Sequence, residues 1–283
     1  MISERLRAEL EAALGPVRDA RGLGGGSINQ ALAVRLADGR AVFVKTLPSP
    51  PRTMYPREAE GLRWLGEAGA LRVPEVLAVS ERFLALELIE PGRPARDHDE
   101  RLGRGLAALH RAGAPGFGFA NDNFIGSLPQ DNHAEADWPT FYASRRLEAQ
   151  LRMAVDGRRA SPAMRRDMAA LIARIDAVVG PAEPPSRLHG DLWGGNAHVA
   201  GDGSPVLIDP AVYGGHREVD LAMMRLFGGF SGRVFDAYDE AWPLAPGWRD
   251  RIPLYQLYPL MVHVNLFGGS YVGQVERALR ALA

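Results

Sequence analysis

The sequence predicts an α+β fold, with a small strand-rich lobe at the N-terminus and a larger helical lobe after it. Three observations support this division. Short runs of alternating apolar residues fill the first ninety residues, helical periodicity dominates the rest, and a Pro-Gly pair at residues 91–92 separates the two patterns. We therefore expect two units, residues 1–90 and 91–283, with a hinge near residues 87–92 and a ligand cleft between them.

The elements expected in the first unit follow from apolar spacing and turn residues. Leu32, Val34 and Leu36 share one face of a predicted strand, and Asp38-Gly39 is a hairpin signal directly after it. A proline-rich loop covers residues 48–56. The expected elements are strands at 29–36, 41–47 and 82–89 and a helix at 58–67.

The second unit shows helical periodicity with capping residues at the helix starts. Residues 100–111 have leucines on one side, and Asp137 is the predicted N-cap of a helix that continues to residue 152. Ser161-Pro162 begins another helix. Residues 113–132, rich in Gly, Pro and Asn, are predicted to form a functional loop. A second strand pair is expected after residue 186, followed by helices to the end.

The composition excludes several classes of protein. The chain has 283 residues, of which 46% are hydrophobic and 24% charged, the balance of a globular protein. Its net charge of −1 argues against a nucleic-acid partner held through backbone phosphates. Because there is no cysteine, disulfides, thiol nucleophiles and cysteine-bound zinc are excluded. The lack of cysteine fits a reducing compartment, and the charged N-terminal helix has no apolar signal core, so we expect a cytoplasmic protein.

One apolar segment is long enough to span a membrane. Residues 252–275 contain no Asp, Glu, Lys or Arg. However, prolines, polar side chains and the pair Gly268-Gly269 interrupt this segment, and such groups are costly in lipid. We expect a buried helix of a globular core here, and no membrane partner.

The stretch H-G-D-L-W-G-G-N at residues 189–196 precedes a predicted hairpin whose register can be derived. If Asp202-Gly203 is a two-residue turn, Asn196 faces Asp209 across the two strands. Cross-strand neighbours lie a few ångströms apart, so these two side chains would meet at the open end of the hairpin, with Asp191 nearby. Three oxygen-bearing side chains in one place suit a hard cation such as Mg²⁺.

These side chains match the requirements of phosphoryl transfer to a hydroxyl group. That reaction needs metal ions that neutralise the phosphates, a carboxylate that accepts the hydroxyl proton and a lysine that binds the phosphates. Asp191 is the candidate catalytic base, and Asn196 and Asp209 are the candidate metal ligands. Taken singly, each residue is better explained as a turn cap or a strand end. The coincidence of motif, hairpin and Asp209 at these spacings favours the catalytic interpretation.

The N-terminal unit supplies a candidate phosphate-binding lysine. Lys45 ends the apolar run V-F-V-K, a pattern typical of kinase nucleotide sites, although an isolated lysine there would usually be a solvated edge charge. Glu58 shares the apolar face of its helix with Leu62 and Leu65. An inward carboxylate needs a cationic partner, and Lys45 is the expected one. Such an ion pair orients a phosphate-binding lysine.

Two further segments are candidates for nucleotide contacts. The backbone amides of Gly24, Gly25 and Gly26 could approach phosphates closely, although glycines of this kind often serve only a turn. The stretch Glu87-Leu88-Ile89 at the hinge could offer backbone groups to an adenine edge, and an ordinary strand end explains it equally well. The motif G-x-x-x-x-G-K-[ST] is absent from the sequence.

On these residues the chain resembles the fructosamine kinase (ketosamine 3-kinase) family, within the aminoglycoside phosphotransferase and protein-kinase-like fold. The most specific stretch is the 189–196 motif followed by D-P-A-V-Y-G-G-H-R-E-V-D-L-A from Asp209. Residues 123–130 and 257–269 and the pairs Asp137-Trp138 and Arg146-Leu147 also resemble family patterns. The resemblance covers nearly the whole chain and implies a two-lobed protein-kinase-like fold.

The resemblance implies a kinase that uses ATP and Mg²⁺ to phosphorylate a sugar hydroxyl of a ketosamine, either small or protein-bound, as in protein deglycation. It assigns Asp191 as the catalytic base, Asn196 and Asp209 as metal ligands, the Lys45–Glu58 pair to the phosphate site and residues 87–89 to the adenine hinge.

The resemblance also suggests supporting and substrate-side residues. Asp220 would be a structural acceptor beneath the catalytic loop. Trp193, His216 and His263 are candidate substrate contacts that could equally be core residues. Some relatives carry a redox-sensitive cysteine in the phosphate-covering loop. This chain has no cysteine, so that regulation should be absent.

Three other interpretations stay open at this point. A different small-molecule kinase of the same fold could act on an aminoglycoside, a choline-like alcohol or a free sugar, although the H-R-E-x-D run favours a ketosamine. A nucleotide-binding pseudokinase would usually lack at least one of the site residues. A metal-dependent hydrolase built on His189 and Asp191 would have a poor metal shell, because no further histidines cluster nearby. The sequence leaves the identity of the sugar and the oligomeric state open.

Overall fold

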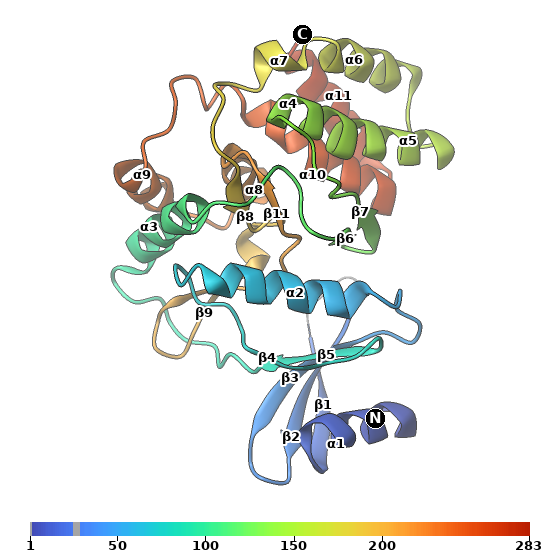
Figure 1. The fold of residues 1–283 in the computed structure, drawn as a ribbon, viewed down its shortest axis with the longest axis vertical. Coiled ribbons are helices and arrows are strands. Elements are labelled where there is room, and N and C mark those ends of the chain that lie inside the picture. Colours follow the sequence, from blue (N-terminus) through green and yellow to red (C-terminus); the bar gives the residue numbers. More distant parts are fainter. Residues whose placement is uncertain (1, 25–28) are drawn as a thin grey trace.

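The computed structural model describes residues 2–24 and 29–283, and it places a five-stranded sheet before a mostly helical part (Figure 1). The sheet is antiparallel, with the strand order β1-β2-β3-β5-β4. The predicted α+β class is therefore confirmed, while the exact boundary between residues 90 and 91 stays a prediction. The elements of this part are α1 (Glu4–Leu14), β1 (Val17–Leu23), β2 (Gln30–Leu36), β3 (Ala41–Thr46), α2 (Met54–Glu67), β4 (Val76–Val79) and β5 (Phe83–Glu87).

Two strands of the sheet were not predicted. They are β1 and β4, the two edge strands. Most side chains of β1 are exposed or half-buried, and all those of β4 are half-buried. Edge strands of this kind lack the strict apolar alternation on which a prediction from periodicity depends.

The sheet has a different helix on each face. Val34 of β2 and Val44 of β3 pack with Leu10 of α1 on one face. Leu84 and Leu86 of β5 pack with α2 on the other face. Figure 1 shows α2 between the sheet and the helices of the second part, so this helix contributes to both. The predicted helix 58–67 is part of α2, which begins four residues earlier, at Met54.

The second part is built mainly from helices that pack around one large apolar cluster. At its centre α10 packs against α8 and α11 (Figure 1). Asp137 caps α4 through Thr140, and the helical path continues through a π-helical turn, η1, into α5. The helices are α3 (His98–Arg111), α4 (Trp138–Phe141), η1 (Tyr142–Glu148), α5 (Ala149–Asp156), α6 (Pro162–Ile172), α7 (Ile175–Val178), α8 (Glu218–Phe227), α9 (Gly232–Ala241), α10 (Ile252–Phe267) and α11 (Ser270–Ala281).

The apolar segment 252–275 forms two helices. α10 ends at Phe267, and Gly268-Gly269 separates it from α11. Most side chains of α10 are buried in the core of the helical part, as the sequence predicted. In the part of the chain that the structure describes, no helix is both long and apolar enough to cross a membrane.

Three short strand pairs complete the structure on the side of the helical part that faces the sheet (Figure 1). One of them, β6–β7, lies inside the segment 113–132 that was predicted to be a loop. The elements are β6 (Asn123–Ile125) with β7 (Leu128–Gln130), β8 (Ser186–Leu188) with β11 (Tyr213–Gly215), β9 (Ala197–Val199) with β10 (Pro205–Leu207), and the 3₁₀ turn η2 (Gly194–Asn196).

Candidate active site

A cavity of about 720 Å³ lies between the sheet and the helical part. Its walls come from β3, α2 and the end of β5 on one side, and from β6 and residues 191–212 on the other. Gly25 and Gly26 lie outside the described residues. The predicted site residues that line the cavity are Gly24, Lys45, Glu58, Glu87, Leu88, Ile89, Asp191, Trp193, Asn196 and Asp209.

Lys45 connects the two sides of the cavity. Its side chain is only 5% exposed, and its Nζ lies 2.5 Å from Glu58 Oε1 and 2.6 Å from Asp209 Oδ1. The predicted contact between Lys45 and Glu58 is therefore present. Burial acts to lower the pKa of Lys45, but the two carboxylates outweigh burial and raise this pKa above its usual value. Lys45 is thus a fixed positive charge at the centre of the cavity.

The register of the β9–β10 hairpin differs from the prediction by one residue. Asn196 lies opposite Ile208 and not opposite Asp209: the Ile208 amide donates to the Asn196 carbonyl at 3.0 Å. The reason is the turn, which has three residues, 201–203, closed by a hydrogen bond from the Ala200 amide to the Ser204 carbonyl at 2.9 Å. Gly203 adopts the left-handed conformation (φ 82°) that such a turn requires.

Asp191, Asn196 and Asp209 nevertheless come together at the cavity wall. Asn196 Nδ2 donates to the Asp191 carbonyl at 2.8 Å, to Asp191 Oδ2 at 3.2 Å and to the Asp209 carbonyl at 3.4 Å. Burial and, second, the negative charge of Asp209 raise the pKa of the Asp191 carboxyl to about 7. The site therefore concentrates negative charge in a way that a bound cation would relieve.

Asp209 holds an unusual backbone conformation. Its φ of 55° places it in the left-handed region, which non-glycine residues rarely adopt. Its side chain is 41% exposed and reaches across the cavity to Lys45. A residue in this conformation must be held by its surroundings, and the segment that follows it, from Pro210 to Val212, also lines the cavity.

Asp220 supports the loop that carries Asp191, as the resemblance implied. The buried carboxylate of Asp220 accepts hydrogen bonds from the amides of His189 (2.8 Å) and Gly190 (2.9 Å). His110 contacts the same carboxylate at 3.2 Å. Gly190 (φ 81°) is required here, because a Cβ would lie 2.0 Å from the Ala211 carbonyl oxygen.

His189 is engaged through both ring nitrogens. Nε2 donates to the Ile208 carbonyl at 2.9 Å, and Nδ1 accepts from the Asp191 amide at 3.2 Å. Burial lowers the pKa of His189, so the ring is neutral at physiological pH. Because neither nitrogen is free to bind a metal, this geometry argues against a hydrolase built on His189 and Asp191.

The hinge prediction falls at the cavity edge. β5 ends at Glu87, so strand pairing does not continue into Leu88 and Ile89, and all three residues line the cavity. The Glu87 side chain forms an ion pair with Arg72 and therefore points to this partner. The Glu87 amide donates to the Glu75 carbonyl at 2.9 Å, so the backbone of Leu88 and Ile89 is the part of this stretch outside strand pairing that a ligand could contact.

The three substrate-side candidates lie in different surroundings. Trp193 lines the cavity with 41% of its surface exposed. His263 is half-buried in an aromatic cluster, 4.8 Å from Phe227 between ring centroids, and is not among the described residues that line the cavity. Phe227 lies between the two, since its ring centroid is 6.4 Å from that of Trp193. His263 is thus separated from Trp193 by Phe227.

His216 requires a correction. It is only 2% exposed, is absent from the cavity lining and stacks on Tyr255 with 5.5 Å between ring centroids. Burial lowers its pKa to about 4, so the ring stays neutral. His216 is therefore a core residue of the helical part and not a substrate contact. The motif around it serves a structural purpose, because Arg217 pairs with Glu183 and Glu218 pairs with Arg251.

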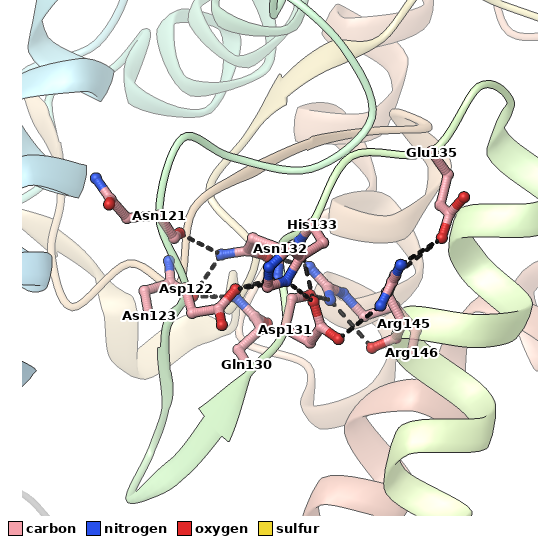
Figure 2. Close-up of polar contacts among 10 residues, drawn as sticks. All are labelled: Asn121, Asp122, Asn123, Gln130, Asp131, Asn132, His133, Glu135, Arg145 and Arg146. Atoms are coloured by element: carbon pink, nitrogen blue, oxygen red, sulfur yellow. Dashed lines mark hydrogen bonds and ion pairs between the residues drawn. The ribbon is translucent and has the colours of Figure 1, made fainter.

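The residues of β6 that form one side of the cavity were not named individually in the sequence analysis. Asn123 and Phe124 of β6 line it, and Asn123 belongs to a buried group of amides shown in Figure 2. Residues 123–130 carried part of the family resemblance, but no role followed from it. The available signal was the density of Asn, Asp and Gln between residues 121 and 132, which is unusual for a segment that the fold buries.

Comparison with known proteins agrees with this geometry. The family model described as fructosamine kinase matches residues 2–283. A probable ketoamine kinase of Enterococcus faecium is 41% identical over 261 residues, covering 90% of this chain and 92% of its own. The chloroplastic protein-ribulosamine 3-kinase of Oryza sativa subsp. indica is 38% identical, covering 88% of this chain and 74% of its own.

Solved structures show the same fold. The crystal structure of a candidate fructosamine-3-kinase from Thermobifida fusca is 42% identical, covers 99% of both chains and superposes with a TM-score of 0.92. The choline kinase of Streptococcus pneumoniae, at 15% identity and a TM-score of 0.64 with 99% of this chain and 98% of its own covered, is similar in fold alone. The two-part kinase-like fold is thereby confirmed, and the chain belongs to the fructosamine kinase family, a family of phosphotransferases whose activity implies ATP.

Proposed function

We propose that this protein transfers the γ-phosphoryl group of ATP to a sugar hydroxyl of a ketosamine. The observation that carries the proposal is the convergence of Lys45, Asp191, Asn196 and Asp209 on one cavity from both parts of the chain. These are the parts that phosphoryl transfer needs. The names of the relatives, ketoamine kinase and ribulosamine 3-kinase, support this acceptor.

In this proposal Asp191 accepts the proton of the attacking hydroxyl, while the hydroxyl oxygen bonds to the γ-phosphorus and ADP leaves. Lys45, oriented by Glu58, binds the phosphates. The backbone of residues 87–89 contacts the adenine, Gly24 approaches the phosphates, and Trp193 packs against the sugar. Aligned in this way, the nucleophile and the phosphoryl group lie between the base and the lysine.

The donor set fits Mg²⁺. Asn196 and Asp209 offer an amide and a carboxylate oxygen beside Asp191, and oxygen ligands are those that Mg²⁺ prefers. The pKa of Asp191 is raised by burial and by the negative charge of Asp209, and a bound cation would offset that charge. Bound Mg²⁺ would neutralise the negative charge of the phosphates and of the Asp191–Asp209 pair.

The charge of the cavity favours a ketosamine over a polycationic aminoglycoside. Three of the four acidic residues that line its described walls have cationic partners: Lys45 contacts both Glu58 and Asp209, and Arg72 pairs with Glu87, while the fourth, Asp191, is the proposed base. A polycation would need unpaired carboxylates to bind it. A ketosamine, whether small or attached to a protein side chain, carries one amine and does not need an acidic surface.

An ATP-consumption screen tests this function. Ketosamines of different sugar length, both free and on a peptide, are compared with aminoglycosides and choline as acceptors. We expect Mg²⁺-dependent ADP formation with a ketosamine and no turnover above background with the others. Turnover with an aminoglycoside or choline alone would contradict the proposal, and absence of any turnover would indicate a nucleotide-binding pseudokinase.

A further inference from the structure

A series of hydrogen-bonded buried side chains connects Arg146 to the segment that follows Asp209, and Figure 2 shows its part from Arg146 through Asn132 to Asn123. Arg146 Nη2 donates to Asn132 Oδ1 at 2.7 Å, and Asn132 Nδ2 donates to Asn123 Oδ1 at 2.9 Å. Asn123 Nδ2 then donates to the Val212 carbonyl at 2.9 Å. All three side chains are buried, so water does not compete for these hydrogen bonds.

Gln130 joins the chain from the neighbouring strand. It is paired directly with Asn123 across the β6–β7 hairpin. Its Nε2 donates to Asn123 Oδ1 at 2.7 Å and to the Ala211 carbonyl at 3.1 Å, and its Oε1 accepts from the Tyr258 hydroxyl at 2.6 Å. Two successive backbone carbonyls, those of Ala211 and Val212, are therefore held by two paired side-chain amides.

The guanidinium of Arg146 sets the direction of the chain. Because arginine only donates, Asn132 must present its oxygen to Arg146 and its NH₂ group to Asn123. Asn123 must then accept through its oxygen, which turns its own NH₂ group towards the Val212 carbonyl. With both amides reversed, donors would face donors at Arg146 and the Val212 carbonyl would lose its partner. Hydrogen bonds aligned in one direction also strengthen one another.

Arg146 is also in direct contact with the same segment. Its guanidinium lies 3.9 Å from the ring centroid of Tyr213 and 4.6 Å from that of Phe141. Arg146 is 0% exposed, and its hydrogen bonds go to neutral oxygens, those of Asn132 and of the Asp131 and Arg145 carbonyls. Burying a charge in this way is costly for stability, and an apolar side chain would fill the volume at lower cost.

Ion pairs hold the outer end of the chain (Figure 2). Arg145 contacts Asp131 at 3.0 Å and Glu135 at 2.6 Å. Asp122 Oδ1 accepts from the Asn132 amide at 2.8 Å. The backbone on either side of Asn132 is thus fixed from the surface, which leaves its side chain in place to connect Arg146 to Asn123.

We propose that Arg146 is a positioning residue for the metal–nucleotide site, acting through Asn132, Asn123 and Tyr213. By fixing the backbone from Ala211 to Tyr213, the chain holds Asp209 in its left-handed conformation with its carboxylate in the cavity. This inference rests on the proposed function, in which Asp209 binds Mg²⁺. It goes beyond that function because none of the residues in the chain except Asn123 lines the cavity.

The substitution Asn132→Asp interrupts this series of hydrogen bonds at its middle. It replaces the NH₂ group of Asn132 with an oxygen and keeps the size of the side chain. An aspartate still accepts from Arg146 but no longer donates to Asn123. The added negative charge by itself would strengthen cation binding, so a loss of Mg²⁺-dependent affinity points to the lost NH₂ donor of Asn132, which also donates to the Asn121 carbonyl at 3.1 Å. Gln150→Glu is the matched control, because Gln150 is also a buried amide of the helical part, paired with Asn265 at 2.8 Å.

The readout is the affinity for ATP by calorimetry, measured once with Mg²⁺ and once with EDTA. We expect Asn132→Asp to weaken ATP binding about tenfold in Mg²⁺, as for loss of one buried hydrogen bond, and to leave the affinity in EDTA unchanged. Gln150→Glu should change neither value. Wild-type affinity in Mg²⁺, or an equal loss in Mg²⁺ and EDTA, would overturn the inference. If Asn132→Asp does not fold, Arg146→Lys, which keeps the charge but not the planar donor geometry, is expected to show the same pattern.

Asp209→Asn separates this inference from the proposed function. If Asp209→Asn keeps the Mg²⁺-dependent affinity of the parent protein, the metal assignment itself is wrong. If Asp209→Asn loses this affinity while Asn132→Asp keeps it, the metal assignment stands and only the positioning role of Arg146 fails.

Discussion

The two walls of the cavity are held in place by different forces. On the side of the sheet, Lys45 and Glu58 form a buried ion pair, with the nitrogen and oxygen 2.5 Å apart. On the side of the helical part, Asn123 and Gln130 hold the backbone after Asp209 through neutral amides. The loop that carries Asp191 is likewise held through backbone amides, which donate to Asp220.

The difference matches what each wall has to do. Lys45 also contacts Asp209, so its contacts can be redistributed when phosphates and a cation enter. A hydrogen bond from an amide to a backbone carbonyl is not displaced by an ion, so the amides keep the catalytic loop fixed while charges rearrange in front of it. The predictions below test this contrast, from the largest expected effect to the smallest.

Asp191→Asn should have the largest effect. It removes the proton acceptor but keeps the shape of the side chain, and we expect the turnover number to fall by at least about a hundredfold. ATP affinity should change little, because Asp191 does not bind the phosphates in our account. Steady-state kinetics and calorimetry on the same preparation check both expectations. A turnover number equal to that of the parent protein would show that Asp191 is not the base.

Lys45→Met and Glu58→Gln test the charged wall. Lys45→Met should lower kcat/KM for ATP by about tenfold to a hundredfold, the range of a charge-assisted hydrogen bond. Glu58→Gln should lower it less, because the lysine remains. If Glu58 acts only through Lys45, the double variant is no worse than Lys45→Met alone. Additive losses in this double-mutant cycle would contradict an orienting role for Glu58.

Trp193→Ala and His216→Phe compare two aromatic positions. Trp193→Ala should raise KM for the sugar substrate about tenfold, because a partly exposed aromatic surface in the cavity is lost. KM for ATP should stay within about twofold. His216→Phe should leave both KM values unchanged, since this ring packs on Tyr255 in the core. A selective rise of the sugar KM in His216→Phe would reverse the correction made for this residue.

The smallest expected effect concerns stability. Folding raises the pKa of Asp191 from 3.8 to about 7, so the folded state holds a proton that the unfolded state releases between these values. The contribution of Asp191 to stability is therefore lost as the pH rises from about 4 to about 7. Without Mg²⁺ and nucleotide, Asp191→Asn should be more stable than the parent at pH 8 and equally stable below pH 4.

Scanning calorimetry in EDTA at several pH values measures this difference. Asp167→Asn, at a surface position, is the control for the loss of one charge, and it should show no comparable gain at pH 8. A stability difference between Asp191→Asn and the parent protein that does not depend on pH would mean that Asp191 is not under electrostatic strain.

The sequence predicted those contacts that follow from a local pattern, such as the periodicity of one helix or the order of residues in one motif. The position of Glu58 on the apolar face of its helix predicted its contact with Lys45, and the order of residues 189–209 predicted that Asp191, Asn196 and Asp209 meet. The register of the hairpin was off by one, because turn length depends on how Gly203 is used and not only on the pair Asp202-Gly203. Even so, the side chains of the site remained within reach of one another.

The contacts that could not be predicted are those made by tertiary packing. Asn123 and Asn132, Arg146, and Val212 come from three separate segments, and no periodicity relates them. His216 shows the opposite error: it belongs to a specific motif, which suggested a role in the site, although the motif builds buried ion pairs in the core. A family motif can be required for catalysis or for stability, and the packing of its side chains shows which of the two applies.

The most direct test of the account follows the γ-phosphate of labelled ATP into a ribulosamine in the presence of Mg²⁺, with the parent protein, Asp191→Asn and Asp209→Asn. The account predicts that the parent protein places label on a sugar hydroxyl, with one ADP formed for each phosphorylated sugar, and that both variants place almost none. Label transfer by both variants at the parental rate, or ATP consumption without a phosphorylated sugar, would contradict a phosphoryl-transfer centre built on these two carboxylates.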